Sequence, residues 1–584
     1  MLRNLRNPRA LAVTIAFAIA IEGLLAIGFL WCVQVGIASS QEKSALLTKI
    51  AEDYTRALPR VGGRCVKVIV NRIASGEAEQ ALARGWDQRI DAYEPPVVWS
   101  PAAQTWLNVL RQDRADRGAS DLLPTATPPS FIRSPLVIGM LDPMAKTLGW
   151  PTRPVGWDEV LKLARDPGGW SSMGHPEWGQ FRLGKTNPNT STSGLHALYG
   201  TYFAAVGRPP VDADLTDPAA MKYVRDVEIA VVHYGDTVSG FLVNLLDADR
   251  RGVELKYVSA IAMEEKQVFD YNNGNPRSLL VPDEDPPNTQ LFAFYPKEGT
   301  LFADHPYAIL NAPWVDADER AAAEGFFGYL VSPAVQRQFT QAGFRDHGGV
   351  PGPEISGRYG LIPEQPRLVH TIPPAALLER MQRSWDDLRK RAHLVLLVDI
   401  SAAMAAPVSS GGTKLDLAKI AAKAALEELA VDDDVGLWVF SAGLSSNTPY
   451  REISGLGPLA SRREELRAAI DALQPTGGDT PLFATTRAGV RHVGDRFDRS
   501  RINALMLLTS GRNTDRDDDL LALQRELQTQ NEEARVRIFA MSYGSAADFE
   551  TVRKIARSSG GIGYNALDPT TTIGRVITQM LSNF

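Results

Sequence analysis

A short segment matches the pattern of a phosphate-binding loop but lacks the context that such a loop needs. Residues 179–186 read Gly-Gln-Phe-Arg-Leu-Gly-Lys-Thr, which satisfies G-x-x-x-x-G-K-[ST]. In a working loop the lysine and the threonine open a helix, whose free N-terminal amides hold the phosphates. Here Asn-Pro-Asn follows at once at 187–189, and residues 181–183 are typical of a strand. We therefore expect no nucleotide to bind at this segment.

A run of hydroxyl side chains just beyond this segment has the chemistry to bind a ligand. Thr190, Ser191, Thr192 and Ser193 precede a glycine and an apolar helix. The N-terminus of a helix presents free backbone amides and a favourable dipole to an anion, and the hydroxyl groups add side-chain donors. The same residues can also serve as a plain helix cap. The spacing alone does not separate these two interpretations.

The net charge and the placement of the histidines argue against nucleic-acid binding and against a catalytic site. The net charge is −6, which gives no electrostatic footprint for nucleic acid, because that requires a clustered basic face. The eight histidines are scattered, and neither H-E-x-x-H nor G-x-S-x-G is present. The sequence therefore indicates a binding protein that is not an enzyme.

The N-terminus carries a compartment signal. Arg3, Arg6 and Arg9 precede an apolar run over residues 11–35. A membrane span needs about 20 apolar residues, whereas a secretory signal has about 7–15. We predict a cytoplasmic tail (1–10), a single transmembrane helix (11–35) and both later domains outside the membrane. Cleavage after the small residues at 36–38 remains the alternative.

The two cysteines are expected to stay unpaired. Cys32 falls within the predicted span, whereas Cys65 lies beyond it. A residue inside the bilayer can hardly reach one in the external domain, so the sequence predicts no disulfide framework.

Two α/β regions follow the apolar run. After a helical stalk (36–59), short strands and helices alternate over residues 60–350, which favours mixed α/β lobes. A Pro- and Gly-rich linker with a connecting helix covers 351–391. In residues 392–584, continuous apolar strands alternate with amphipathic helices, which is typical of a doubly wound domain with a parallel sheet covered on both faces.

The first of these regions resembles the extracellular solute-binding proteins of bacterial ABC transporters. The resemblance is carried by short segments whose order and spacing match, at 97–101, 134–138, 185–188, 295–299 and 342–345. It implies two lobes joined by crossover strands near 134–140 and 291–295, with a small polar or anionic ligand in the cleft between them. Ser100 stands at the end of a strand, where open α/β sheets bind ligands. With it, the cleft residues would be Thr190, Ser191, Ser193 and Glu264.

The second region resembles von Willebrand factor type A domains, whose metal site takes an Asp-x-Ser-x-Ser loop, a threonine and a further aspartate. Asp399, Ser401 and Thr480 match this set. Ala403 replaces the second serine, and Ser510 replaces the aspartate. Since Mg²⁺ prefers carboxylate ligands, the resemblance implies a degenerate site with no cofactor or with weakly bound Mg²⁺. Asp479 could partly substitute.

These features together predict a membrane-anchored extracytoplasmic protein without enzymatic activity. It would join a solute-binding module to an adhesion module that binds a protein partner through the C-terminal domain. Two alternatives stay open. The chain could be the solute receptor of an ABC importer, or the partner subunit of an AAA+ ATPase if the topology is inverted, since some von Willebrand A proteins serve such motors.

Overall fold

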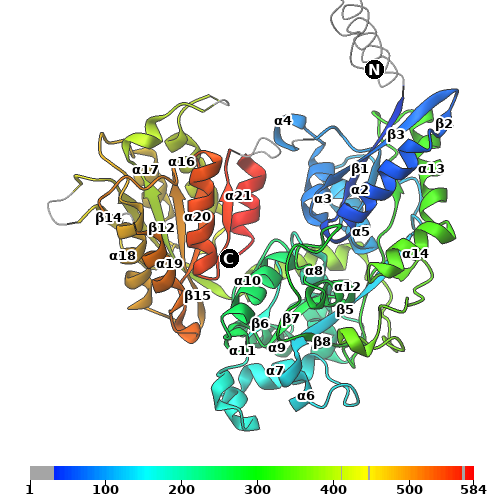
Figure 1. Ribbon diagram of the computed structural model, residues 1–584, viewed down its shortest axis with the longest axis horizontal. Coiled ribbons are helices and arrows are strands. Elements are labelled where there is room, and N and C mark those ends of the chain that lie inside the picture. The colour runs from blue at the N-terminus through cyan, green and yellow to red at the C-terminus, as the bar shows by residue number, and fades with distance from the viewer. Residues whose placement is uncertain (1–31, 92, 409–410, 445–447, 518, 568–572) are drawn as a thin grey trace, which may run out of the picture.

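Three β-sheets organise the chain, two in a bilobed N-terminal domain and one in the C-terminal domain (Figure 1). The structure is a computed structural model that describes residues 32–584 except 92, 409–410, 445–447, 518 and 568–572. The α/β fold class expected from the alternating strands and helices is confirmed.

Lobe 1 is built on a five-stranded sheet in the order β10-β4-β1-β3-β2. Its central strands are parallel, and the buried side chains of Val33, Val35 and Ile37 on β1 pack with Leu47 and Ile50 of α2. The strands are β1 (Val33–Ser39), β2 (Arg60–Val61), β3 (Arg64–Arg72), β4 (Val98–Ser100) and β10 (Ala308–Ile309). The helices are α2 (Gln41–Arg56), α3 (Ser75–Arg84), α4 (Gln88–Asp91), α5 (Gln104–Asp116), α13 (Ala317–Leu330) and α14 (Pro333–Gln341).

Lobe 2 surrounds a mixed sheet in the order β11-β5-β7-β6, in which β8 and β9 also pair with β5. The strands are β5 (Ile132–Leu141), β6 (Leu183–Gly184), β7 (Ala260–Glu264), β8 (Leu291–Phe294), β9 (Phe302–Ala303) and β11 (Arg345–Asp346). The helices are α6 (Asp142–Thr147), α7 (Trp157–Arg165), α8 (Thr192–Val206), α9 (Pro218–Ile229), α10 (Val238–Arg250), α11 (Glu254–Tyr257) and α12 (Glu265–Asn272). All five side chains of β7 are buried.

The chain crosses between the lobes where the first crossover was expected, but the second crossing comes later. Ile132 at the start of β5 packs in the core of lobe 1, and Leu136 further along packs in the core of lobe 2. Residues 291–295 instead lie within lobe 2, because β8 pairs with the inner part of β5. The return to lobe 1 runs from β9, which pairs with β5, to β10, which pairs with β4.

The C-terminal domain has a six-stranded sheet in the order β14-β13-β12-β15-β16-β17, parallel except for the edge strand β14. Its strands are β12 (Arg391–Asp399), β13 (Asp434–Phe440), β14 (Tyr450–Ser454), β15 (Arg501–Thr509), β16 (Arg537–Ser542) and β17 (Gly563–Asn565). The helices are α16 (Lys414–Glu428), α17 (Arg463–Asp471), α18 (Leu482–Gly494), α19 (Leu520–Gln528), α20 (Ala546–Ser558) and α21 (Ile573–Leu581). Helices cover both faces, as expected for a doubly wound domain.

The C-terminal domain is packed against the lobes rather than tethered to them. One buried apolar cluster runs through both lobe 2 and the C-terminal domain, where His233 makes an edge contact with the ring of Phe539. The connecting helix α15 (Ala375–Leu388) contacts α5 of lobe 1 and α8 of lobe 2. Figure 1 shows the C-terminus enclosed between the domain and the lobes, and the amide of Tyr234 donates to the carbonyl of Asn583. The expected linker over 351–391 is therefore a structural part of the junction.

The N-terminal boundaries differ from those expected. Most of the predicted span, and the tail before it, lies outside the described residues. Its last residues, Val33 to Val35, belong to β1, and the stalk expected over 36–59 forms the end of β1 and helix α2 in lobe 1. A buried parallel strand is nearly as apolar as a membrane span, so the apolar pattern alone did not separate β1 from the predicted span. No helix in the part of the chain that the structure describes is long and apolar enough to cross a membrane.

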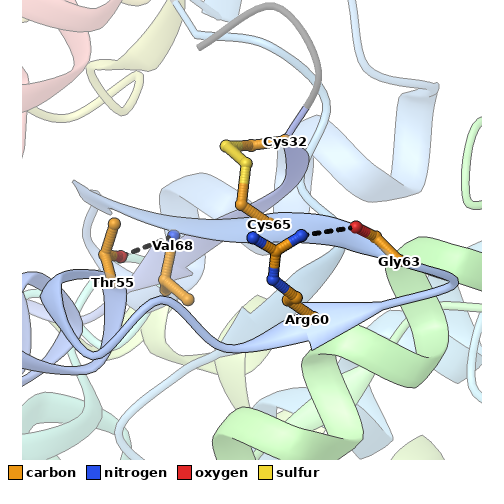
Figure 2. The surroundings of a disulfide bond; sticks show 6 residues. All are labelled: Cys32, Thr55, Arg60, Gly63, Cys65 and Val68. Carbon is orange, nitrogen blue, oxygen red and sulfur yellow. Dashed lines mark hydrogen bonds between the residues drawn. A yellow bond between two sulfur atoms is a disulfide. The ribbon is translucent and has the colours of Figure 1, made fainter. Parts of the chain in front are cut away.

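The expectation of unpaired cysteines was wrong. Cys32 and Cys65 form a disulfide, with Cα atoms 4.4 Å apart (Figure 2). Strands β1 and β3 run parallel and pair Val33 with Val66, so the residues before them lie side by side. Figure 2 also shows Val68 of β3 donating to the hydroxyl of Thr55, a bond that ties α2 to this sheet. Because β1 begins at Val33, Cys32 lies at the edge of the folded lobe.

Candidate functional site

A polar pocket lies between the two lobes. Lobe 1 contributes the segments 40–42 and 74–75, and lobe 2 contributes 190–193 and 236–239 together with Glu264 and Gln267. The cavity measures about 40 Å³, enough for about three water molecules or a group of a few heavy atoms. The lobes touch around it: the amide of Gly76 donates to the carbonyl of Thr190 at 3.1 Å, and the indole of Trp106 donates to the hydroxyl of Thr192 at 2.8 Å. The structure therefore shows a closed cleft.

Five helices begin at this pocket: α2, α3, α8, α10 and α12. The residues that precede four of them, Ser40, Ala74, Ser191 and Thr237, make no side-chain capping hydrogen bond. Each helix N-terminus carries the positive end of its dipole, and the first-turn amides that have no acceptor can donate to a ligand. Five such ends directed at one cavity favour an electron-rich ligand.

The hydroxyl run predicted as a binding loop lines the pocket. Ser191 occupies the residue before α8, yet its hydroxyl makes no hydrogen bond within the described residues, and neither does that of Ser193, which is 3% exposed. Thr190 has only a long contact of 3.4 Å to the carbonyl of Asn187. The serine hydroxyls are therefore available to a ligand rather than used as a helix cap.

Three carboxyl groups share the pocket with these donors. Burial raises the pKa of Asp236 to about 6, and burial beside Glu42 raises the pKa of Glu264 well above its ordinary value. Behind them, the ammonium of Lys43 is fully buried, and burial lowers its pKa to about 8. A carboxyl group that stays protonated can donate a hydrogen bond. The pocket therefore offers both donors and acceptors to a polar ligand.

Ser100, the remaining residue expected in the cleft, lies behind the pocket wall. It is fully buried, and its carbonyl accepts from the amide of Ser40 at 3.2 Å and from Nζ of Lys43 at 2.9 Å. Thr190, Ser191, Ser193 and Glu264 line the pocket, whereas Ser100 supports the start of α2. The segments 40–42 and 236–239 were missed. Both begin with hydroxyl or acidic residues ahead of a helix, which is the signal that identified 190–193.

One group of side chains beneath the pocket has the composition of a metal site. Glu42, Glu264 and His305 can each offer a ligand atom, and these atoms lie within 4.8 Å of one another. However, Nζ of Lys43 lies 3.3 Å from Nδ1 of His305, and an ammonium at that distance repels a dication. The group instead links the lobes, because His305 contacts Glu42 at 3.5 Å and Glu264 at 3.4 Å.

The segment that matches a phosphate-binding loop does not form one. Leu183 and Gly184 form strand β6, and the next helix, α8, begins only at Thr192. The side chain of Lys185 is fully buried and forms an ion pair with Glu228. The lysine is therefore engaged within lobe 2, away from any phosphate.

The three predicted metal-site residues of the C-terminal domain converge at the carboxyl edge of its sheet. Asp399 ends β12, and the hydroxyls of Ser401 and Thr480 lie 2.7 Å apart. One Asp399 oxygen accepts from the Ser401 amide at 2.9 Å, and the other accepts from the hydroxyls of Thr509 and Ser510 at 2.9 and 3.1 Å. Asp479 is exposed.

These residues do not fit a bound divalent ion. Ser510, which stands where a metal-binding domain has an aspartate, donates to Asp399 and uses the oxygen that an ion would need. Burial raises the pKa of Asp399, although the hydrogen bonds from Ser401, Thr509 and Ser510 act in the opposite direction. With one carboxylate and two mutually bonded hydroxyls, the site offers Mg²⁺ few protein oxygen ligands.

Two lobes that close over a polar pocket define a solute-binding protein, and a doubly wound domain with this loop set defines a von Willebrand A domain. The chain belongs to the bacterial extracellular solute-binding protein family, which matches residues 35–345, and its residues 393–577 match the von Willebrand factor type A domain. Both resemblances predicted from the sequence are confirmed.

Relatives that match most of this chain are found in Mycobacterium tuberculosis. Uncharacterized protein Rv1836c (strain ATCC 25618 / H37Rv) is 24% identical over 524 residues, which cover 88% of this chain and 71% of that protein. Uncharacterized protein MT1884 (strain CDC 1551 / Oshkosh) gives the same values. The match extends well beyond one domain.

Solved structures resemble this chain only distantly. The sulfate-binding protein SubI from Mycobacterium tuberculosis H37Rv has 16% identity and a TM-score of 0.34, covering 54% of this chain and 87% of that one. The periplasmic binding protein AfuA from Actinobacillus pleuropneumoniae has 12% identity and a TM-score of 0.41, covering 62% and 99%.

Proposed function

We propose that this protein is a non-enzymatic extracytoplasmic binding protein that couples solute capture to a protein partner. Its inter-lobe pocket takes a small polar or anionic ligand, and its von Willebrand A domain binds the partner. The convergence of five helix N-termini on one hydroxyl-lined cavity between the closed lobes carries the ligand assignment. The carboxyl groups of Asp236 and Glu264 favour a ligand that also carries hydroxyl or acid protons.

The disulfide supports a position outside the cytoplasm. Disulfides persist in oxidising compartments and are rare in the reducing cytosol. The Cys32–Cys65 bond therefore agrees with both domains lying beyond the membrane. It also weighs against the AAA+ partner alternative, which needs a cytoplasmic domain. Anchoring by residues 11–35 remains part of the proposal.

The contacts of the C-terminal domain support coupling between the two modules. Arg575 of α21 pairs with Glu77 of lobe 1, whereas Arg557 of α20 pairs with Asp247 of lobe 2. A ligand that holds the lobes closed would therefore keep both of these ion pairs formed at the same time. A ligand shifts an equilibrium only through its different affinity for the two states. The partner-binding domain would thus sense whether the cleft is closed.

The receptor of an ABC importer is the second candidate function, favoured by the family of the bilobed domain and its closed cleft. The two functions differ in the event that ligand binding triggers. A receptor for import is needed for uptake of its solute, so a strain lacking the protein would fail to accumulate that solute. A sensor would leave uptake unchanged and alter capture of the protein partner.

A solute screen on the detergent-solubilised full chain tests the ligand assignment. We expect sulfate, phosphate, carboxylic acids or sugar phosphates to raise the melting temperature, with an added stability of about 2.7 kcal/mol at a concentration of one hundred times Kd. Apolar solutes serve as the negative control. Stabilisation by apolar solutes alone would contradict a polar pocket.

A further inference from the structure

A second cavity, separate from the inter-lobe pocket, lies between lobe 2 and the C-terminal domain. It measures about 370 Å³, within the range of about 300–1,000 Å³ typical of small-molecule sites. Lobe 2 forms one wall with residues such as Phe181 and Ile229, and the C-terminal domain forms the other with Phe497 and Arg537. Lys390, the residue just before β12, also lines the cavity.

The lining is strongly basic. It contains six cationic side chains and two carboxylates: Arg182, Lys390, Arg499, Arg501, Arg535 and Arg537 against Glu532 and Glu533. Four of the arginines already have partners. Arg535 bonds to Glu532 at 2.7 Å, and Arg499 pairs with Glu533 at 3.7 Å. Arg501 reaches the carbonyl of Asp432 at 2.7 Å, and Arg182 reaches that of Glu532 at 2.7 Å. Arg537 and Lys390 are the cations that neighbouring groups compensate least.

Arg537 is a buried cation without a partner. The residue is 6% exposed, its Nε and Nη2 atoms are shielded from solvent, and its guanidinium makes no hydrogen bond or ion pair with any described residue. The adjacent Tyr257 ring, 5.9 Å away, offers only a weak cation–π contact. Burying an unpaired charge costs several kcal/mol. A native structure normally offsets this cost by giving the buried charge a bonding partner.

Lys390 adds a second cation at the same place. Its Nζ donates once, to the carbonyl of Val231 at 2.8 Å, and it has no carboxylate partner among the described residues. Burial, together with the charges of Arg537 and Arg182, lowers its pKa to about 7. Two cations that destabilise each other create a local positive potential, which a bound anion would relieve.

We infer that this interdomain cavity binds a small organic anion, a carboxylate or phosphate monoester with an apolar body. The anionic group contacts Lys390 and Arg537. The body lies against Phe181, Ile229 and Phe497. Because a guanidinium binds such oxyanions in a forked geometry, Arg537 suits this role better than a lysine would. The ligand would join the C-terminal domain to lobe 2, independently of the inter-lobe pocket.

The site is distinct from the von Willebrand metal loops. Lys390 precedes β12 and Arg537 opens β16, whereas Asp399 closes β12. A strand rises about 3.3 Å per residue, so the cavity and the loops lie at opposite edges of the sheet. Binding at one edge therefore involves none of the residues at the other.

Calorimetry on the detergent-solubilised full chain tests the assignment with phenyl phosphate as the probe. We expect phenyl phosphate to bind, inorganic phosphate to bind more weakly, and benzyl alcohol not to bind. Arg537→Met and Lys390→Met should each weaken phenyl phosphate binding at least tenfold. The matched control is Arg553→Met on the exposed face of α20, which should bind like the parent protein. The variant Ser191→Ala/Ser193→Ala, altered only in the inter-lobe pocket, should also bind normally.

The melting temperature measured without the probe is a second readout. It separates a ligand-binding Arg537 from one that only stabilises the fold. Replacing an unpaired buried guanidinium by methionine removes a desolvated charge, so Arg537→Met should melt at or above the parent temperature. The inference is overturned if the parent chain does not bind phenyl phosphate, or if Arg537→Met binds it unchanged. Loss of binding in the inter-lobe variant alone would also overturn it.

Discussion

The hydroxyl of Ser401 lies 2.7 Å from that of Thr480, a contact that joins two loops of the C-terminal domain 79 residues apart in the chain. In a metal-binding domain both oxygens would face an ion. Here they bond to each other while Ser510 donates to Asp399. The loops therefore have the arrangement of a metal site and the hydrogen bonds of a closed polar cluster.

Restoring the family ligands should create metal binding. We expect Ala403→Ser/Ser510→Asp to bind Mg²⁺ in the millimolar range or tighter by calorimetry, because a second carboxylate completes the oxygen set. Without metal this variant should melt below the parent protein, since the new carboxylate repels Asp399 and removes its donor. The single change Ala403→Ser is the control and should show little gain. Tight Mg²⁺ binding by the unmodified domain would contradict the closed-cluster interpretation.

The serines at the start of α8 should dominate affinity in the inter-lobe pocket. For the solute identified by the screen, Ser191→Ala/Ser193→Ala should reduce affinity at least tenfold, because each hydrogen bond to a charged ligand contributes about 1.5–3 kcal/mol. Ser100→Ala, which changes a residue behind the pocket wall, is the comparison and should have a smaller effect. Equal affinity of the double variant and the parent would mean that the loop only begins the helix.

Anion binding in the inter-lobe pocket should weaken as pH rises through about 6. The pKa of Asp236 is raised to about 6, so below that pH the group is neutral and can donate, and above it the carboxylate repels an anion. The folded state also holds this proton between the unfolded pKa of about 4 and pH 6, so stability should fall as pH rises across that window. Asp236→Asn should flatten both profiles, measured by titration and by melting between pH 4 and 8. A profile unchanged by the substitution would assign the dependence to another group, such as Glu77 with a pKa of about 7.

Removing the disulfide should destabilise lobe 1 without preventing ligand recognition. The bond closes a separation of 33 residues, for which loop entropy gives about 3–4 kcal/mol. We expect Cys32→Ser/Cys65→Ser to lower the free energy of unfolding by up to this amount in denaturant titrations. The parent protein treated with reductant should behave like the variant. Identical stability of oxidised and reduced parent protein would contradict a structural role.

Arg575 should link the state of the cleft to the C-terminal domain. It pairs with Glu77 and also donates to the carbonyl of Arg72 at 3.0 Å, both in lobe 1. Arg575→Ala should leave the lobe 2 contacts in place while freeing lobe 1 to open. Hydrogen exchange should then increase in α21 and α3. Ligand added to the parent protein should protect α21, and that protection should be lost in the variant. Unchanged protection would show that the two modules act independently.

The sequence by itself determined the features that depend on local pattern. Continuous apolar strands between amphipathic helices predicted the doubly wound domain, because a strand buried on both faces must be apolar throughout. The resemblance to von Willebrand A domains identified Asp399, Ser401 and Thr480, and the strand order predicted that their loops meet at one edge of the sheet. The hydroxyl run at 190–193 was recognisable because a helix N-terminus leaves amides unsatisfied whatever its surroundings.

Tertiary structure alone decided which distant segments meet. The pairing of Cys32 with Cys65 depends on the parallel register of β1 and β3, and the continuous apolar run over residues 11–35 hides that register in the sequence. The pocket needed the starts of α2 and α10 as well as α8, and nothing local to Glu42 or Asp236 shows that both line the same pocket. Likewise, Lys390 and Arg537 become candidate ligand-binding residues only because the two domains enclose them. Burial and charge proximity are properties of long-range packing, so residue type and spacing could not specify them.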